Sequence, residues 1–172
     1  LSSEREIRET EYLLKKAKLF SWEILPLFSR LSTNEQNRIF NESKKRRIIL
    51  STNIAETSVT VPNIRFVIDT GKVRISRYSF RSKIQRLPIE SISRASADQR
   101  AGRSGRTMPG ICYRLYTQND YDDRSAYTDP EILRTSLASV ILKMLDLRIG
   151  NIDTFSFVDQ PDSRQISDGY QL

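Results

Sequence analysis

Two short, mainly hydrophobic runs constrain the fold of this chain most strongly. The first covers residues 48–50 and precedes Ser-Thr-Asn, and the second covers residues 64–70 and ends at Gly71. Runs of this length that alternate with helical segments are typical of strands in a parallel sheet with helices on both faces. The sequence therefore predicts an α/β fold whose polar residues gather at the carboxyl ends of the strands, where open sheets bind ligands.

Other segments supply further strands and a capped helix. Residues 22–27 are apolar and residues 110–116 alternate, so both are predicted to be strands. Ser3 and Glu6 have the spacing of a capping box, in which a hydroxyl and a carboxylate each accept a hydrogen bond from a free amide. We expect a helix over residues 4–18 behind this cap.

Three arginines recur at every third position and so share roughly one face of a short helical segment. They are Arg100, Arg103 and Arg106, with Gly102 and Gly105 between them. Each glycine destabilises a helix by about 1 kcal/mol, and a basic helix that is only solvated would gain nothing from having glycine at these positions. Guanidinium groups recognise phosphate through paired hydrogen bonds and neutralise charge on a transferring phosphoryl group. A phosphate site is favoured here over a solvated basic face.

The positive charge lies mostly in the first part of the 172 residues. Lys and Arg number 28 against 21 Asp and Glu, and residues 1–110 hold 22 of the basic and 11 of the acidic side chains. A basic body of this kind suits a polyanionic partner, although ordinary surface solubility would also account for it. The length allows one sizeable core and an appended module.

The residue types that are rare or absent exclude several kinds of functional site. Cys112 is the single cysteine and histidine is absent, which excludes an internal disulfide, a histidine zinc site and a histidine-dependent triad. We expect no membrane span and no export signal, and hence a cytoplasmic location, because no apolar run approaches roughly 18 residues. Leu1 resembles the end of a truncated strand, so we also expect a piece of a longer protein.

Two stretches resemble motifs of superfamily 2 helicases. Residues 99–106, Gln-Arg-Ala-Gly-Arg-Ser-Gly-Arg, resemble motif VI in the form with a leading Gln that DEAH-box RNA helicases carry. Residues 51–60, Ser-Thr-Asn-Ile-Ala-Glu-Thr-Ser-Val-Thr, resemble motif V of that family. Both motifs in this order and separation are specific, so the chain is identified as a member of the DEAH-box ATP-dependent RNA helicases, in their bacterial HrpA-like branch.

The resemblance implies a domain organisation. Residues 1–129 would form a RecA-like α/β domain, the second of two motor domains, with an inserted β-hairpin. Residues 130–172 would form the beginning of a winged-helix domain. Apolar residues at spacings of three and four predict an amphipathic helix that ends at Gly150 and whose apolar positions are Leu133, Leu137, Val140, Ile141, Met144 and Leu145.

The resemblance also implies contacts with a nucleotide. Arg103 and Arg106 would reach the γ-phosphate as arginine fingers, and Gln99 would help to position the attacking water. Ser58 and Thr60 face the nucleotide in relatives. ATP is the implied cofactor, with other nucleoside triphosphates as alternatives, and Mg²⁺ would be held by the first motor domain, so that this chain itself holds no metal.

Phe40 has two interpretations. It stands near the end of a helix that Ser32 caps, and from the sequence alone an aromatic residue there is more often part of the core. In the family, however, the Phe of the Arg-Ile-Phe sequence at residues 38–40 stacks on the base of the nucleotide. Such stacking tolerates any base, because every base has a π-face.

Residues 72–88 combine basic and apolar side chains in two short stretches separated by residues 79–82, which predicts a projecting β-hairpin. In DEAH-box helicases a hairpin at this place lies against the RNA, so the resemblance implies RNA contacts for Arg77, Arg81 and Lys83. A solvated edge hairpin is the alternative. The resemblance also implies RNA backbone contacts for Ser3 and Thr52.

The chain contains neither the Gly-x-x-x-x-Gly-Lys-Ser/Thr loop that cradles phosphates nor the Asp-Glu-Ala-His motif. The family implies that a first RecA-like domain of the same polypeptide supplies both, so the isolated chain is expected to be inactive. The partners implied are that domain and RNA, with DNA as an alternative polynucleotide. The competing function is a non-catalytic basic nucleic-acid-binding module with vestigial helicase motifs.

Overall fold

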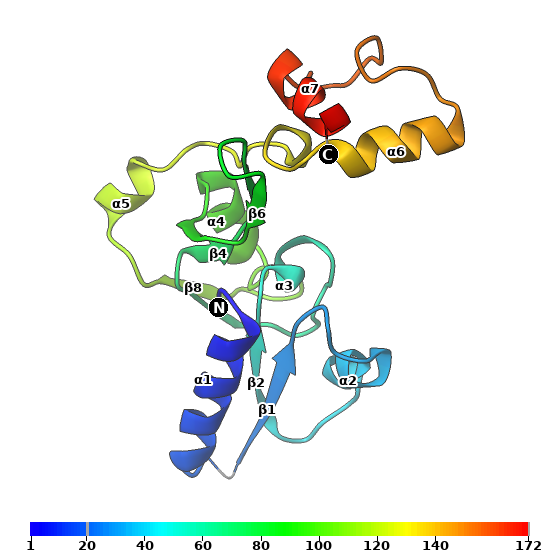
Figure 1. The fold of residues 1–172 in the computed structure, drawn as a ribbon. Coiled ribbons are helices and arrows are strands. Elements are labelled where there is room, and N and C mark those ends of the chain that lie inside the picture. The colour runs from blue at the N-terminus through cyan, green and yellow to red at the C-terminus, as the bar shows by residue number, and fades with distance from the viewer. Residues whose placement is uncertain (20, 172) are drawn as a thin grey trace. The chain divides into compact units, whose positions relative to one another are not determined.

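The structure, a computed structural model, describes residues 1–19 and 21–171 (Figure 1). The chain divides into two compact units, of which the first comprises Leu1–Arg74 and Ile89–Thr128 and the second Ile75–Pro88 and Asp129–Leu172. The units differ from the two predicted domains mainly in the hairpin, since residues 75–88 belong to the second unit. Leu172, the last residue of the predicted winged-helix segment, lies outside the described residues.

Short helices and strands alternate along the first unit. In chain order the elements are α1 (Glu4–Lys16), β1 (Trp22–Leu27), α2 (Thr33–Asn37), the 3₁₀ helix η1 (Arg38–Phe40), β2 (Arg46–Ser51), α3 (Ile54–Thr57), β3 (Phe66–Asp69), β4 (Lys72–Arg74), β7 (Ile89–Ser91), α4 (Arg94–Ala101), β8 (Ile111–Arg114) and α5 (Gln118–Asp122). The predicted strands at residues 22–27, 48–50, 64–70 and 110–116 are therefore all present.

The predicted parallel pairing is confirmed, but the described strands form separate pairs. β1 runs parallel to β2, and β3 runs parallel to β8. β4 and β7 pair in antiparallel fashion. Among the described strands β2 and β3 do not pair with each other, and a cleft of about 1700 Å³ is lined by residues of both. Spacing in the sequence predicts strand direction through helical crossovers, but it does not specify which strands become neighbours.

The β1–β2 pair is covered on both faces, as the prediction required. On one face Ile7 of α1 packs with Phe28, Leu31 and Leu50. On the other face Leu25, Leu27 and Ile39 form a second cluster, against which residues of α3 such as Ile54 also pack. Helices are thus held to this pair by apolar side chains that alternate along its strands.

The β3–β8 pair is only half-covered, so the expectation of helices on both faces of the sheet is wrong for this pair. Helix α4 contacts β3. The side chains of Phe66 and Ile68 are nevertheless 55% and 69% exposed, and their register partners Ile111 and Tyr113 are exposed as well. Alternate side chains of a strand point to opposite faces, so these four share the uncovered face.

The two predicted helix caps have different outcomes. The Ser3 hydroxyl accepts a hydrogen bond from the Glu6 amide at 3.3 Å, as predicted. The Glu6 carboxylate, however, accepts from the amide and hydroxyl of Ser2, at 2.6 and 2.8 Å, so the reciprocal half of the box falls one residue earlier. At Ser32 both halves of the capping box are present with Glu35. The helix behind Ser32 becomes a 3₁₀ helix before it ends at Phe40.

The second unit contains a β-hairpin and a small helical core. Its elements are β5 (Arg77–Ser79), β6 (Ile84–Arg86), the 3₁₀ helix η2 (Glu131–Leu133), α6 (Ala138–Leu147) and α7 (Ser163–Gln171). β5 and β6 pair in antiparallel fashion, which confirms the predicted hairpin. Helix α6 ends at Leu147, and the residues Arg148 and Gly150 that follow it have left-handed φ angles of 54° and 108°.

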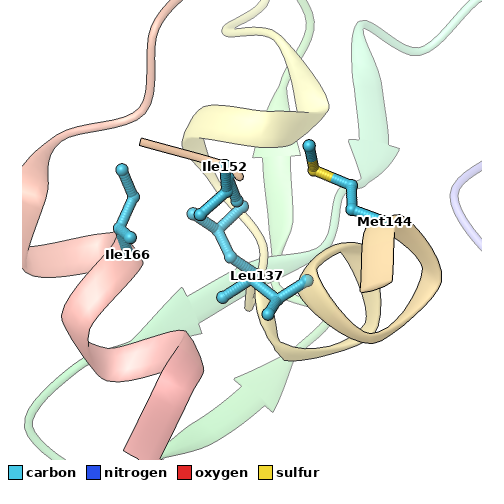
Figure 2. Packing of buried hydrophobic residues seen from close by; sticks show 5 residues of the cluster. Leu137, Met144, Ile152 and Ile166 are labelled. Carbon is cyan, nitrogen blue, oxygen red and sulfur yellow. The ribbon is translucent and has the colours of Figure 1, made fainter. Parts of the chain in front are cut away.

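The core of this unit lies between α6 and α7, and its buried side chains are Leu137, Ile141, Met144, Ile152 and Ile166 (Figure 2). Gly169 permits this packing, since a Cβ atom there would lie 2.7 Å from Cδ1 of Ile141. Two positions predicted on the apolar face of one helix differ from the prediction: Leu145 of α6 is 60% exposed, and Leu133 lies outside α6, in the 3₁₀ helix η2. Within the part of the chain that the structure describes, no helix combines the length and apolar character that crossing a membrane requires.

Candidate functional site

Motif V and motif VI meet in the first unit. Motif V leaves the end of β2 and forms α3, while motif VI covers the end of α4 and the turn behind it, and α3 contacts α4. The Arg106 guanidinium donates from Nη1 to Oγ1 of Thr60 at 2.6 Å. Arg103 donates from Nη2 to the carbonyl oxygen of Glu56. Three of the predicted nucleotide-binding residues are thereby brought together, although the bonded residues lie 46 and 47 positions apart in the sequence.

Arg103 carries donors that no group in the described part of the chain satisfies. Its Nε and Nη1 atoms are buried and have no hydrogen-bond partner among the described residues. Burial, and then the positive charge of Arg106, lowers the pKa of the Arg103 guanidinium, against an opposing effect of Glu56. A guanidinium remains charged in proteins, and buried donors are normally paired. These two nitrogens therefore favour an anion as the missing partner.

Arg100 behaves differently from the other two arginines. Its side chain is only 12% exposed, with Nε 2.9 Å from Oε2 of Glu56 and Nη1 2.8 Å from Oδ1 of Asp69. The prediction that three arginines share a phosphate-facing surface is therefore wrong for Arg100. Helix α4 ends at Ala101, so Arg103 lies beyond the regular helix and does not follow its periodicity.

Asp69, at the end of β3, is a buried carboxylate with every oxygen engaged. Oδ1 accepts from the Gly71 amide at 2.9 Å as well as from Arg100, and Oδ2 accepts from the Tyr116 hydroxyl at 2.8 Å. Burial alone would raise the pKa of the Asp69 carboxyl, but the Gly71 amide, Arg100 and Tyr116 together hold that pKa below its usual value. The pKa of Tyr116 is raised by burial and by the neighbouring Asp69.

The remaining nucleotide-binding candidates are accessible. Gln99, on α4, and Ser58 and Thr60, which follow α3, are exposed. Phe40 ends η1 and is 51% exposed as a residue, while the neighbouring Ile39 is buried. The core interpretation of Phe40 is therefore wrong, and the ring is available to a ligand.

The two backbone-contact candidates for RNA lie near each other. Ser3 caps α1. Thr52 directly follows β2, and its amide donates to the carbonyl oxygen of Leu27 at 3.2 Å. The amino group of Leu1 donates to the carbonyl oxygen of Ser51 at 2.9 Å, which brings the first residues of the chain to the carboxyl end of β2. This is the edge of a parallel pair where ligands are expected.

The hairpin cations of the second unit are mostly paired within the chain. Arg77 lies 2.7 Å from the Asp129 carboxylate. Lys83 forms an ion pair with Asp168, a buried residue of α7 that also accepts a hydrogen bond from the Tyr78 hydroxyl at 2.5 Å. Arg81 is exposed at the hairpin tip. The hairpin is thus anchored within its own unit, and the choice between an RNA-contacting hairpin and a solvated edge hairpin stays a prediction.

Comparison with known proteins agrees with the two motifs. Residues 1–108 match the family described as the helicase conserved C-terminal domain. The chain belongs to this family. It is 59% identical, over all 172 residues, to the ATP-dependent RNA helicase HrpA of Escherichia coli and equally to the HrpA homolog of Haemophilus influenzae. The chain spans 13% of the length of each of these relatives. The predicted resemblance to HrpA-like DEAH-box helicases is confirmed.

Two solved structures of the Escherichia coli protein HrpB share the fold of this helicase domain. One, described as a DExH-box NTPase, superposes with a TM-score of 0.86 at 31% identity. The other, described as a DEAH/RHA helicase, superposes with a TM-score of 0.91 at 32% identity. Each covers 99% of this chain, which covers 21% and 22% of them respectively. The domain accordingly has the RecA-like α/β fold of helicase motor domains, whereas the winged-helix beginning stays a prediction.

Two residues of this helicase domain were missed by reasoning from the sequence. Glu56 is a motif V residue to which the sequence assigns no role, but its side chain is 11% exposed and binds Arg100. Asp69 has a local signal, because an Asp two residues before Gly at a strand end favours a turn in which the carboxylate binds the backbone. Within the described ranges, no group of three His, Cys, Asp or Glu side chains is placed to hold a metal ion.

Proposed function

We propose that this chain is the second motor domain of an ATP-dependent RNA helicase, and that it contributes arginine fingers to ATP hydrolysis and part of the path of single-stranded RNA. The observation that carries the proposal is the pair of buried, unpartnered nitrogens of Arg103 beside Arg106 and the motif V hydroxyl of Thr60. Guanidinium donors with no internal partner among the described residues fit a phosphate group supplied by a ligand.

Each side chain of this site has a role that its surroundings allow. Arg103 and Arg106 would contact the γ-phosphate and stabilise the charge of the transition state. Gln99, exposed on the same segment, would orient the attacking water, and Ser58 and Thr60 would contact the nucleotide. In hydrolysis, the γ-phosphoryl group of bound ATP is transferred to this water. Mg²⁺ would be held by the first motor domain, so this chain alone should not hydrolyse ATP.

Base and RNA contacts complete the proposal. The exposed ring of Phe40 would stack on the nucleotide base without selecting its identity. Ser3 and Thr52 would contact the RNA backbone at the carboxyl edge of β2. Arg81 would contact RNA directly, whereas Arg77 and Lys83 would exchange their carboxylate partners for phosphate groups.

Replacing Arg106 in the full-length protein tests the proposal. Arg106→Ala should lower kcat for ATP hydrolysis by about 10³-fold or more, while the affinity for single-stranded RNA stays within about twofold, because an arginine finger acts on the transition state. Arg94→Ala, which removes an exposed arginine from the same segment, is the matched control and should leave both quantities unchanged. Normal hydrolysis without RNA binding would make Arg106 a backbone ligand. Absence of RNA-stimulated hydrolysis in the parent protein would favour the non-catalytic binding module.

A further inference from the structure

The base of the hairpin, defined as the antiparallel pair β4–β7, is bonded directly to motif VI. We propose that Asp69 is a positioning residue that couples the nucleotide site to the hairpin base through Arg100. The inference rests on the proposed function, because it assigns a path of contacts between ATP hydrolysis and RNA binding in that motor domain. All residues of the path belong to the first unit.

The first observation is the position of Asp69 and Arg100 at the start of β4. Arg100 Nη1 donates to Oδ1 of Asp69 at 2.8 Å and to the carbonyl oxygen of Lys72 at 3.2 Å. The same Oδ1 atom of Asp69 accepts from the Gly71 amide at 2.9 Å. On the other side of the base, the Ile92 amide donates to the Gly71 carbonyl at 3.0 Å. A motif VI side chain therefore binds the turn from which the hairpin leaves the sheet.

The second observation is that this junction is rigid. Asp69 is 2% exposed, and its other oxygen is held by the Tyr116 hydroxyl. Arg124 lies over the Tyr116 ring, 3.8 Å from its centre, and donates to the Gly71 carbonyl at 3.4 Å. A buried network in which each member is satisfied has few alternative arrangements, so it transmits a displacement instead of absorbing it.

The third observation is that the path continues to the arginine fingers. Arg100 Nε donates to Oε2 of Glu56 at 2.9 Å, and the carbonyl oxygen of Glu56 accepts from Arg103. The chain of contacts thus runs from Arg103 through Glu56, Arg100 and Asp69 to Gly71. When Arg103 turns toward a phosphate, it leaves the Glu56 carbonyl, and the resulting shift of α3 against α4 reaches the hairpin base.

Arg100 is accordingly a positioning residue and not a phosphate ligand, although it belongs to the same motif as the fingers. Its charge is already compensated by two carboxylates, of which Asp69 is fully buried. Arg103, in contrast, has donors to spare. In this proposal the three motif VI arginines divide into two that face the nucleotide and one that binds the hairpin base.

The test uses Asp69→Asn in the full-length protein, because asparagine keeps the shape and the Oδ1 acceptor but removes the charge. Three rates are measured on one preparation: ATP hydrolysis without RNA, hydrolysis with saturating poly(U), and unwinding of an RNA duplex. Stimulation by poly(U) and base pairs unwound per ATP should each fall roughly tenfold, within the usual range of coupling between two sites. Hydrolysis without RNA should stay within about twofold of the parent, since Asp69 is buried and binds Gly71, Arg100 and Tyr116, none of which belongs to the proposed catalytic site.

Two further variants keep the result decisive. Arg100→Lys should lower the coupling as much as Asp69→Asn does. The variant that combines both substitutions should show no greater loss of coupling than either single variant, because both changes break one path. Asp98→Asn is the matched control, since Asp98 pairs with Arg114 at 2.6 Å on the exposed side of the same helix. If Asp69→Asn fails to fold, Tyr116→Phe weakens the same carboxylate contact with a smaller change and should lower the coupling in the same direction.

The outcomes separate this inference from the proposed function. Coupling equal to the parent in Asp69→Asn and in Tyr116→Phe overturns the inference while leaving the motor intact. The inference is also overturned if basal and stimulated hydrolysis fall by the same factor and the melting temperature falls with them, because that pattern indicates a structural role only. A parent protein that hydrolyses no ATP refutes the proposed function, and the coupling with it.

Discussion

Alanine in place of Gly71 should destabilise the first unit by about 2–5 kcal/mol. Gly71 has a φ angle of +70°, and a Cβ atom there would lie 2.6 Å from both Nη2 of Arg124 and Cδ1 of Tyr116. The left-handed backbone costs an L-residue about 1–2 kcal/mol. Forcing extra volume into a packed interior costs about 1–3 kcal/mol more, because the buried Arg124 and the Tyr116 ring have little room to move.

Urea denaturation of the chain, followed through the fluorescence of Trp22, measures this effect. Trp22 is the only tryptophan and lies in β1 of the first unit. With a slope of about 2 kcal/mol per molar urea, the midpoint should fall by roughly 1–2.5 M. Gly105→Ala is the matched control, because a Cβ atom there has no heavy atom within 4 Å among the described residues. A Gly71→Ala midpoint equal to that of Gly105→Ala would refute the reasoning.

The remaining predictions concern charge. The pKa of Asp69 lies below its unfolded value of about 3.9, so its stabilising contribution should be complete at neutral pH and decline as the pH falls below about 5. Urea midpoints measured from pH 7 to pH 3 should therefore fall less steeply for Asp69→Asn than for the parent, and parallel curves would contradict this. Replacing Arg77, Arg81 and Lys83 by alanine in the full-length protein should preserve ATP hydrolysis and reduce unwinding. The salt dependence of single-strand binding should also become shallower by roughly 0.7 log units for each RNA phosphate that the variant no longer neutralises, whereas unwinding at the parental rate would remove the hairpin from the mechanism.

Local structure was largely predictable from local patterns. The strand at residues 22–27 and the hairpin strands around residues 79–82 were located correctly, and the capping serines mark the helix starts at Glu4 and Thr33. These signals depend on neighbours within about four positions, since caps and periodicity involve only adjacent turns. The motifs likewise predicted the family, because their residue order is itself the signal.

Partners in space were not predictable, because they depend on which distant segments pack together. Nothing in the pattern of residues 66–69 specifies β8 as their neighbour, or that Phe66 and Ile68 face outward. The same holds for Phe40, for which burial and exposure were both compatible with the sequence. Helix and strand periodicity describes which side chains share a face, and only tertiary packing determines what that face meets.

The arginines of motif VI illustrate this division most clearly. Their identity and spacing follow from the sequence alone, and so does the expectation that some of them bind phosphate. Their different tasks follow from the fold, because Asp69 and Glu56 reach Arg100 from separate segments and leave the Nε and Nη1 atoms of Arg103 unpaired among the described residues. A guanidinium carries the same charge at every position, so its role is set by the acceptors that tertiary structure brings within about 3 Å.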